Sequence, residues 1–312
     1  MKITDVLGCV GWVAFFLLAY ALVPFVGPFF SLLIPLPFLY YSTKLGFSQG
    51  VKVAVFATFI IGLIVILAGR KQIILISLEF GLLGLALAQL FKGKYSLGQT
   101  VFWATIFMLL LSLGFLTYLG FSRNMGPLEM IDNYRQFNVE ATIKTYKDMG
   151  IKQENIIEIE TYGKFFMDIV SRIFPSLIII GTGFAIWLNI VIAKPLFRIK
   201  KLKYPDFVPM DRWQVPDSLI WGLIISGFAL LLPSEVIKFV AINILIVILA
   251  IYLFHGLSIA VFFLNKYHVP PWIRIGIYFL IIIQLLFLVV LVLAGIFDQW
   301  VDFRKIHRRV TT

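Results

Sequence analysis

One carboxylate lies well inside an apolar segment of this chain. Glu79 is near the middle of residues 71–91, KQIILISLEFGLLGLALAQLF. About 20 apolar residues form a helix long enough to cross a bilayer. A charge at bilayer depth costs about 2.5–3.5 kcal/mol on insertion scales, so a membrane protein pairs, shields or uses it. Glu79 is therefore a candidate ligand-binding residue. A structural ion pair with Arg70, Lys71 or Arg274 is the alternative.

Other polar side chains interrupt other apolar segments. With Glu79 they make up the predicted substrate-binding set: Asn189, Asn243, His255 and Gln284. Each needs a hydrogen-bond partner in hydrocarbon. Hydrogen bonding between helices is the simpler interpretation of the three amides. His255 is either a proton relay or ligand contact, or a polar residue that is satisfied at a kink beside Gly256.

Common cofactor and metal motifs are absent from the sequence. It contains no G-x-x-x-x-G-K-[ST] and no H-E-x-x-H, so we expect neither a P-loop for ATP nor a zinc-protease helix. His255, His268 and His307 are too scattered in sequence to suggest a metal site. Cys9 is the single cysteine and excludes a disulfide framework. We therefore expect a protein that is not an enzyme, without catalytic residues, metal or cofactor.

Composition indicates a membrane protein. Of 312 residues, 61% are hydrophobic and 14% are charged, and the mean hydropathy is +0.97. Soluble domains have about 45–50% apolar and about 25% charged residues. The net charge of +11 suggests basic cytoplasmic loops that face anionic lipid, rather than a nucleic-acid partner. The expected environment is thus a lipid bilayer.

The apolar segments predict an all-α, polytopic transmembrane helical bundle. Candidate spans fall within residues 1–25, 29–41, 51–68, 71–91, 100–121, 176–193, 218–232, 236–264 and 273–297. We divide the chain into N-terminal membrane helices (1–121, about five spans), an insert (122–172) and C-terminal membrane helices (173–312). The second candidate span contains Pro35 and Pro37, so we expect it to be kinked and packed against neighbouring helices.

The insert, residues 122–172, differs in composition from the rest of the chain. It holds eight of the sixteen acidic residues. Val139, Ile143 and Tyr146 share the spacing of one helix face, and a second amphipathic helix is expected to lead into the membrane at Pro175. Two helices on the membrane face, outside the cytoplasm, are one interpretation, and a solvated hairpin linker is the other.

Charge distribution predicts the topology. The basic loop 194–217 and the basic C-terminal tail should both be cytoplasmic, but three apolar segments separate them. Residues 218–232 are short for a span and end at Pro233, so we expect this segment to be re-entrant. Eight spans then remain, with both termini in the cytoplasm. Nine full spans with one basic end outside is the alternative.

Two sets of residues are candidates for docking a partner. Ala54, Thr58 and Gly62 recur every four residues, which lets helix backbones approach closely. Packing within the bundle is the simpler interpretation, and a partner-docking face is the alternative. Arg212, Trp213 and Asp217 combine an aromatic ring with opposite charges, which is typical of an anchor at the headgroup level. A docking surface for a cytoplasmic partner is again the alternative.

The C-terminal half resembles a known family at particular positions. They are Trp213, Pro216, Asp217, Trp221, Gly256, Leu257, Asp298, Trp300, Asp302, Phe303, Arg304 and Lys305. With these residues the chain resembles the YybS-type family of uncharacterised bacterial integral membrane proteins. That family is distantly similar to the substrate-binding membrane subunits of energy-coupling-factor transporters. The resemblance implies a bacterial inner-membrane protein that binds a small molecule and docks on a separate energising module.

Two functions are consistent with these features. The first is a small-molecule-binding transport component that lacks an ATPase of its own, with its site around Glu79. The second is a scaffold or regulator of envelope or division machinery, which would act through the 122–172 insert and the basic loops. The buried carboxylate favours the first function. The concentration of acidic residues in one insert motivates the second.

Overall fold

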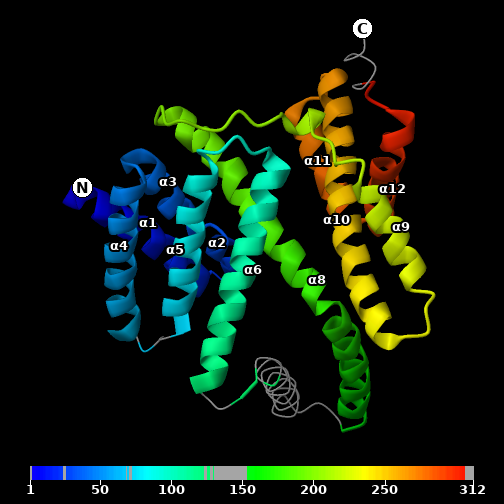
Figure 1. Cartoon of the computed structure of the whole chain (residues 1–312), viewed down its shortest axis with the longest axis horizontal. Helices are drawn as coiled ribbons and strands as arrows, with labels where there is room; N and C mark the ends of the chain where they lie inside the picture. The colour runs from blue at the N-terminus through cyan, green and yellow to red at the C-terminus, as the bar shows by residue number, and fades with distance from the viewer. Residues whose placement is uncertain are drawn as a thin grey trace. The chain divides into compact units, whose positions relative to one another are not determined.

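The computed structural model describes residues 2–23, 26–67, 69, 72–122, 125, 126, 129 and 153–305. Within this part of the chain every regular element is helical, which confirms the all-α prediction (Figure 1). The elements are α1 (Ile3–Leu22), α2 (Gly27–Ser31), α3 (Pro35–Leu45), α4 (Phe47–Leu67), α5 (Gln72–Leu90), α6 (Leu97–Ser122), α8 (Gln153–Ile199), η1 (Met210–Arg212), α9 (Leu219–Ala229), α10 (Glu235–Lys266), α11 (Pro271–Ile283) and α12 (Leu285–Val301).

Several helices are long and apolar enough to cross a bilayer. Among the described residues these are α1, α4, α6, α10 and the part of α8 from Thr161 to Ile199. A sixth span results if the bent pair α11 and α12 is counted as one. The membrane class is therefore confirmed, whereas the predicted count of eight spans is not.

The chain divides into two compact units. Unit 1 comprises Met1–Thr142 and Gly181–Asp206, and unit 2 comprises Ile143–Ile180 and Phe207–Thr312. The long helix α8 contributes its first part to unit 2 and its second part to unit 1. Unit 1 combines residues from both sides of the insert, whereas unit 2 combines part of the insert with residues that follow it. The division into three segments stays a prediction.

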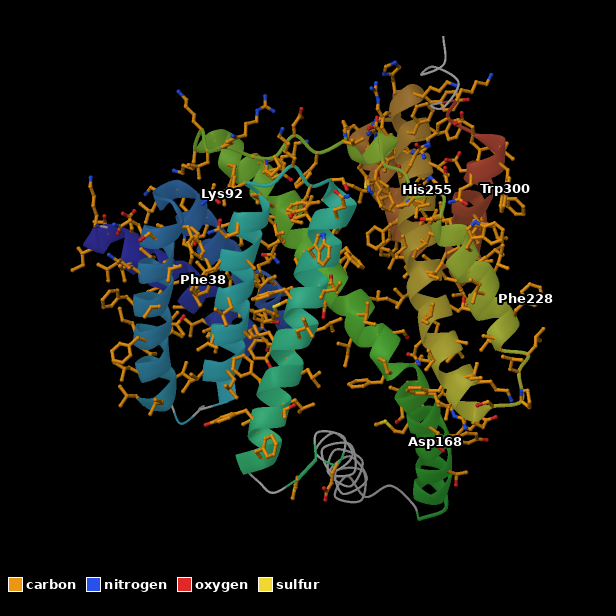
Figure 2. The ribbon with its side chains drawn as sticks, viewed as in Figure 1. Phe38, Lys92, Asp168, Phe228, His255 and Trp300 are labelled. Atoms are coloured by element: carbon orange, nitrogen blue, oxygen red, sulfur yellow. The ribbon has the colours of Figure 1, made fainter. Side chains whose placement is uncertain are left out.

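Unit 1 is built around α3. Every residue from Pro35 to Ser42 is buried, and Phe38 lies among the surrounding helices (Figure 2). Helix α5 approaches closely because Gly84 has no side chain. A Cβ there would lie 2.5 Å from Phe38 Cβ and 2.6 Å from the Pro35 carbonyl oxygen. Residues 29–41, expected as one kinked span, are instead divided between two short helices, α2 and α3. Pro35 and Pro37 lack the N–H groups of a continuous helix.

Unit 2 is built around α10, which α9 and α12 flank (Figure 1). Tyr252 of α10 is fully buried and packs with Val215 and Ile248. Helix α9 is only 11 residues long, which is too short to cross a hydrocarbon core of about 30 Å. The shortness expected of residues 218–232 is therefore found, and their re-entrant course stays a prediction.

The last apolar segment is sharply bent. A span is predicted over residues 273–297, and in this segment α11 and α12 meet at a bend of 98°. Gln284 lies at the bend with extended backbone angles (φ −97°, ψ 107°). No proline lies in this segment to explain the break. Beyond the bend, α12 packs along α10 through close contacts at Gly256 and Gly295.

From Gln153 onward the insert is helical. Helix α8 begins at Gln153 and continues past Pro175 to Ile199, so the second predicted amphipathic helix and the following span are one element. The first predicted helix, around Val139–Tyr146 in the sequence, lies outside the described residues.

Candidate functional site

Glu79 lies between two helices of unit 1. It is half-buried on α5, and the Ser112 hydroxyl of α6 donates a hydrogen bond to its Oε1. Within the described chain, no lysine or arginine forms an ion pair with this carboxylate; Arg70 and Lys71 lie outside it. The other proposed partner, Arg274, bonds to the Val269 and Leu264 carbonyls and to Asn265 in unit 2.

Depth makes this carboxylate unusual. Glu79 is about 10 Å from the first residue of α5 and about 16 Å from the last, at about 1.5 Å per residue. Its neighbours on the helix are apolar. A half-buried carboxylate whose single described partner is a hydroxyl keeps further acceptor sites for another donor. Glu79 can therefore hydrogen-bond a ligand that carries an N–H or O–H group, or bind a cation.

The predicted small-residue face lies beside α5. Ala54 and Gly62 of α4 are buried and Thr58 is half-buried. The three residues line a groove of about 410 Å³ together with Gly81, Leu82 and other residues of α5. These contacts show that the small residues pack within unit 1. A partner on this face would therefore contact the groove and its rim, and not a fully exposed row of small residues.

A second group of polar side chains is fully enclosed in unit 2. Arg304 is 4% exposed, His255 and Asp298 are each 2% exposed, and Ser258 is 0% exposed. Arg304 Nη2 donates to Asp298 Oδ2 at 2.9 Å and to His255 Nε2 at 2.8 Å. His255 Nε2 also lies 3.1 Å from Asp298 Oδ2, so the arginine, the carboxylate and the histidine are in mutual contact. Figure 2 shows His255 on α10 within this part of unit 2.

Arg304 also satisfies irregular backbone. Its Nη1 donates to the carbonyl oxygens of Asp211 and Trp213, each at 3.1 Å. Ser258 Oγ lies 2.6 Å from the Met210 carbonyl oxygen and 2.8 Å from that of Trp213. These carbonyls belong to the single turn η1 and to Trp213 directly after it, where hydrocarbon would leave them unpaired. We call Arg304, Asp298, His255 and Ser258 the arginine cluster.

Local sequence explains how the arginine cluster assembles. Asp298 accepts a hydrogen bond from the Phe303 N–H at 2.8 Å, and Asp302 adopts a left-handed conformation with φ 47°. The chain therefore turns back after α12 and brings Arg304 to α10. Gly256 and Gly295 let α10 and α12 touch, because a Cβ on Gly256 would overlap the Leu291 carbonyl.

The arginine cluster is suited to structure rather than catalysis. Its positive and negative charges neutralise each other, and both are bonded to several protein groups. Within the described chain no three His, Cys, Asp or Glu side chains are grouped to hold a metal ion. Breaking such a buried pair is costly, so the arginine cluster fixes residues 302–304 and residues 210–213 to α10.

A serine motif of hydrolases occurs once but lacks their structural context. Residues 46–50, GFSQG, match G-x-S-x-G. Hydrolases use this motif at a strand-to-helix turn, which aims the serine at a histidine. Here Gly46 forms the corner between α3 and α4 with φ 81°, and exposed Ser48 belongs to the first turn of α4. The motif therefore does not indicate hydrolysis.

The predicted substrate-binding residues do not share one set of partners. Asn189 of α8 donates to the Leu32 and Ala185 carbonyls at 2.7 Å each, within unit 1. Asn243 of α10 bonds to the backbone of α8 in unit 2. Gln284 is exposed at the bend between α11 and α12. Their described contacts are structural, and a role in substrate binding stays a prediction.

The second predicted docking set is partly enclosed. Trp213 is half-buried, with its ring edge against the His255 ring at a centroid distance of 6.2 Å. Arg212 and Asp217 are exposed. Trp213 therefore holds the 210–213 segment in place, and only the two charged side chains are free for a partner.

Sequence reasoning missed Arg304, Asp298 and Ser258 as buried groups. Arg304 lies beyond the last apolar segment and looked like part of a solvated basic tail. Asp298 directly follows the last candidate span, residues 273–297. Two signals could have indicated the Asp298–Arg304 pair. The acid and the base are six residues apart around the end of an apolar segment, and another apolar segment contains His255.

Comparison with known proteins places the chain in a family. A family model described as "Predicted membrane protein (DUF2232)" matches residues 12–299. The chain belongs to this DUF2232 family. It is 23% identical over 289 residues to the Uncharacterized protein YybS of Bacillus subtilis (strain 168), covering 91% of each chain. No solved structure matches it.

Family membership agrees with the resemblance identified in the C-terminal half. The family match ends at residue 299 and so includes Trp213, His255 and Asp298 but not Arg304. This DUF2232 protein is an integral membrane protein by its family and its apolar helices, and neither description assigns an activity.

Proposed function

We propose that this DUF2232 protein is a transport component that binds a small molecule in unit 1. The observation that supports the proposal is the Glu79 carboxylate inside α5, with the Ser112 hydroxyl as its described partner. Ionisable residues within membrane helices commonly mark substrate or ion pathways. The ligand would carry a cationic group or a hydrogen-bond donor, because an ionised carboxylate can only accept.

The contrast with the arginine cluster strengthens the choice of Glu79. Asp298 is closed in and receives donors from Arg304 and Phe303. Glu79 is only half-buried, and its hydrogen-bond partner Ser112 is exposed. Of Glu79 and Asp298, Glu79 is the one that a ligand can reach without first breaking an ion pair.

The proposal includes a separate source of energy. The sequence has no P-loop, so a partner module would supply the ATPase and this chain would perform no catalytic step. The rim of the α4–α5 groove offers that partner exposed apolar side chains, Val55, Phe59 and Leu63. We place the protein in the bacterial cytoplasmic membrane with both termini inside, following the distribution of basic loops.

A thermal-shift screen of small metabolites on the purified protein tests this function. At least one compound should raise the midpoint of wild-type unfolding, and Glu79→Gln should abolish that shift while leaving the unliganded midpoint nearly unchanged. Glu235→Gln is the matched control, since Glu235 is an exposed carboxylate at the start of α10. A stabilising compound that acts equally on the Glu79→Gln protein would refute the site.

A specific feature of α8 supports the second candidate, a scaffold or regulator. Arg172 and Lys238 flank Glu235 at 3.7 and 3.0 Å, which marks the charged end of the unit 2 helices. Tyr162, Phe165 and Phe166 lie about 9–15 Å beyond Arg172 on α8 and are 72%, 66% and 63% exposed.

Exposed aromatic residues beyond a charged helix end fit a protein-binding surface. Cross-linking from Tyr162 in cells should then capture a discrete partner. Phe165→Ser with Phe166→Ser should prevent the capture. Cross-linking to lipid alone would argue against this candidate.

A further inference from the structure

Three apolar helices of unit 1 have ends that lie together. Helix α4 begins at Phe47, α5 ends at Leu90 and α8 ends at Ile199. Lys92, just after α5, places its Nζ 5.8 Å from the centre of the Phe47 ring. Figure 2 shows Lys92 at this end of α5. The apolar segments stop here, so this end of unit 1 is where bilayer headgroups would lie.

An aromatic cluster joins the ends of α5 and α8. Phe91, Phe197 and Tyr204 pack edge to face, with ring centroids 5.6–6.1 Å apart. The Tyr204 hydroxyl donates to the Ile190 carbonyl at 3.0 Å, which ties the following loop back to α8. The lysines on either side of this cluster are therefore held near one another.

The lysines at this end are exposed and lack described acidic partners. We call them the basic rim: Lys92, Lys94, Lys200, Lys201 and Lys203. None forms an ion pair with a described carboxylate, and Asp5 is bonded instead to Lys44 at 2.7 Å. Asp206 is the nearest acid along the loop. The basic rim thus carries an excess of positive charge.

Helix stabilisation accounts for only part of the basic rim. Lysines in the last turn complement the negative end of a helix, but the effect falls off within that turn. Lys94 and Lys203 each lie four residues past the last helical residue. Lys201 adopts φ 52° in the turn that ends α8, where the Leu202 N–H donates to the Phe197 carbonyl at 2.9 Å. Glycine is the usual residue there.

We propose that the basic rim binds the headgroup of an anionic phospholipid. The exposed lysines lie at the level where the apolar helices end, so they are already in contact with lipid headgroups. An acidic protein would have to displace those headgroups in order to bind. Each lysine near an anionic bilayer surface contributes about 1 kcal/mol, or about fivefold in affinity. The aromatic cluster supplies a rigid apolar floor beneath the headgroup.

Lipid nanodiscs provide the test. The full-length protein is placed in phosphatidylcholine alone or with 30% phosphatidylglycerol, about one lipid in three, a composition chosen to give a strongly anionic surface. Phosphatidylglycerol retained after detergent extraction is then counted by native mass spectrometry. The variant is Lys200→Gln with Lys203→Gln. The matched control, Lys266→Gln with Lys305→Gln, removes two exposed lysines from unit 2.

The wild type and the control should retain phosphatidylglycerol over phosphatidylcholine. The Lys200→Gln, Lys203→Gln protein should retain it about 25-fold less, because each of the two lost charges contributes about fivefold. Equal retention by this variant and the wild type would overturn the proposal. So would full displacement of the lipid by acidic polypeptide, which would indicate a protein partner, or by millimolar inorganic phosphate, which would indicate a free-anion site.

Discussion

Asn243 on α10 completes hydrogen bonding in α8 next to Pro175. The Ser176 N–H donates to Asn243 Oδ1 at 2.9 Å, and Asn243 Nδ2 donates to the Arg172 carbonyl at 2.8 Å. In a regular helix this N–H and this carbonyl bond to each other. A proline opens the preceding turn of its helix, and the amide of Asn243 bridges the opening.

Replacing Asn243 by leucine should destabilise the protein. Both backbone groups of α8 would lose their partner in a buried site, at about 1–3 kcal/mol for each unsatisfied group. Unfolding in mixed micelles should show a loss of about 2–6 kcal/mol.

Pro175→Ala provides the control for that interpretation. Without the proline, α8 can restore its own hydrogen bonds, so Asn243→Leu should cost less in a Pro175→Ala background. Equal costs in the two backgrounds would show that Asn243 does not act through the proline turn.

Arg304→Met should also be strongly destabilising. The substitution leaves Asp298 as a buried charge without its main partner and frees the carbonyls of Asp211 and Trp213. Removal of one member of a buried ion pair typically costs about 3–5 kcal/mol. The same unfolding measurement checks the value.

The double variant Arg304→Met with Asp298→Leu separates charge from packing. It leaves no unpaired charge, so its cost should be smaller than the sum of the two single substitutions. Additive costs would mean that the two residues act independently, contrary to their 2.9 Å contact.

Some of these features could be predicted from the sequence and others could not. The membrane class follows from apolar segments, because burial in lipid imposes it on the whole chain. The preference of Asn243 for a partner on another helix followed from the same rule. The bend at Gln284 could not be predicted, because it depends on how α12 packs against α10. Similarly, Arg304 is buried through a turn at Asp302 that no local pattern announces.

A further prediction concerns the packing contact between α10 and α12. A methyl group on Gly256 would overlap the Leu291 carbonyl, so Gly256→Ala should cost about 1–3 kcal/mol through overpacking. Gly276→Ala on α11 is the control, because nothing lies within 4 Å of a Cβ there. The control should be neutral or stabilise by about 0.5–1 kcal/mol. Similar losses for both variants would contradict this packing.

The ion pair of Lys44 with Asp5 should make a small, pH-dependent contribution to the free energy of unfolding. Its hydrogen bond to Asp5 raises the pKa of Lys44 above the ordinary value. A raised pKa means that the stabilisation is complete below the unfolded value of about 10.4 and is lost as pH rises through the folded value. Since Lys44 is 40% exposed, Lys44→Met should cost less than about 1 kcal/mol at pH 8.

The difference between the wild type and Lys44→Met should disappear at strongly alkaline pH. Unfolding midpoints of both proteins, measured from pH 8 to about pH 11.5, provide the check. A difference that grows with pH would reverse the expected sign.

Native mass spectrometry of the purified protein tests the central claim, that Glu79 holds a small molecule in unit 1. Wild type and Glu235→Gln should each carry the same small-molecule adduct, and Glu79→Gln should retain its fold but lose that adduct. The same adduct on the Glu79→Gln protein would contradict a binding site at this carboxylate.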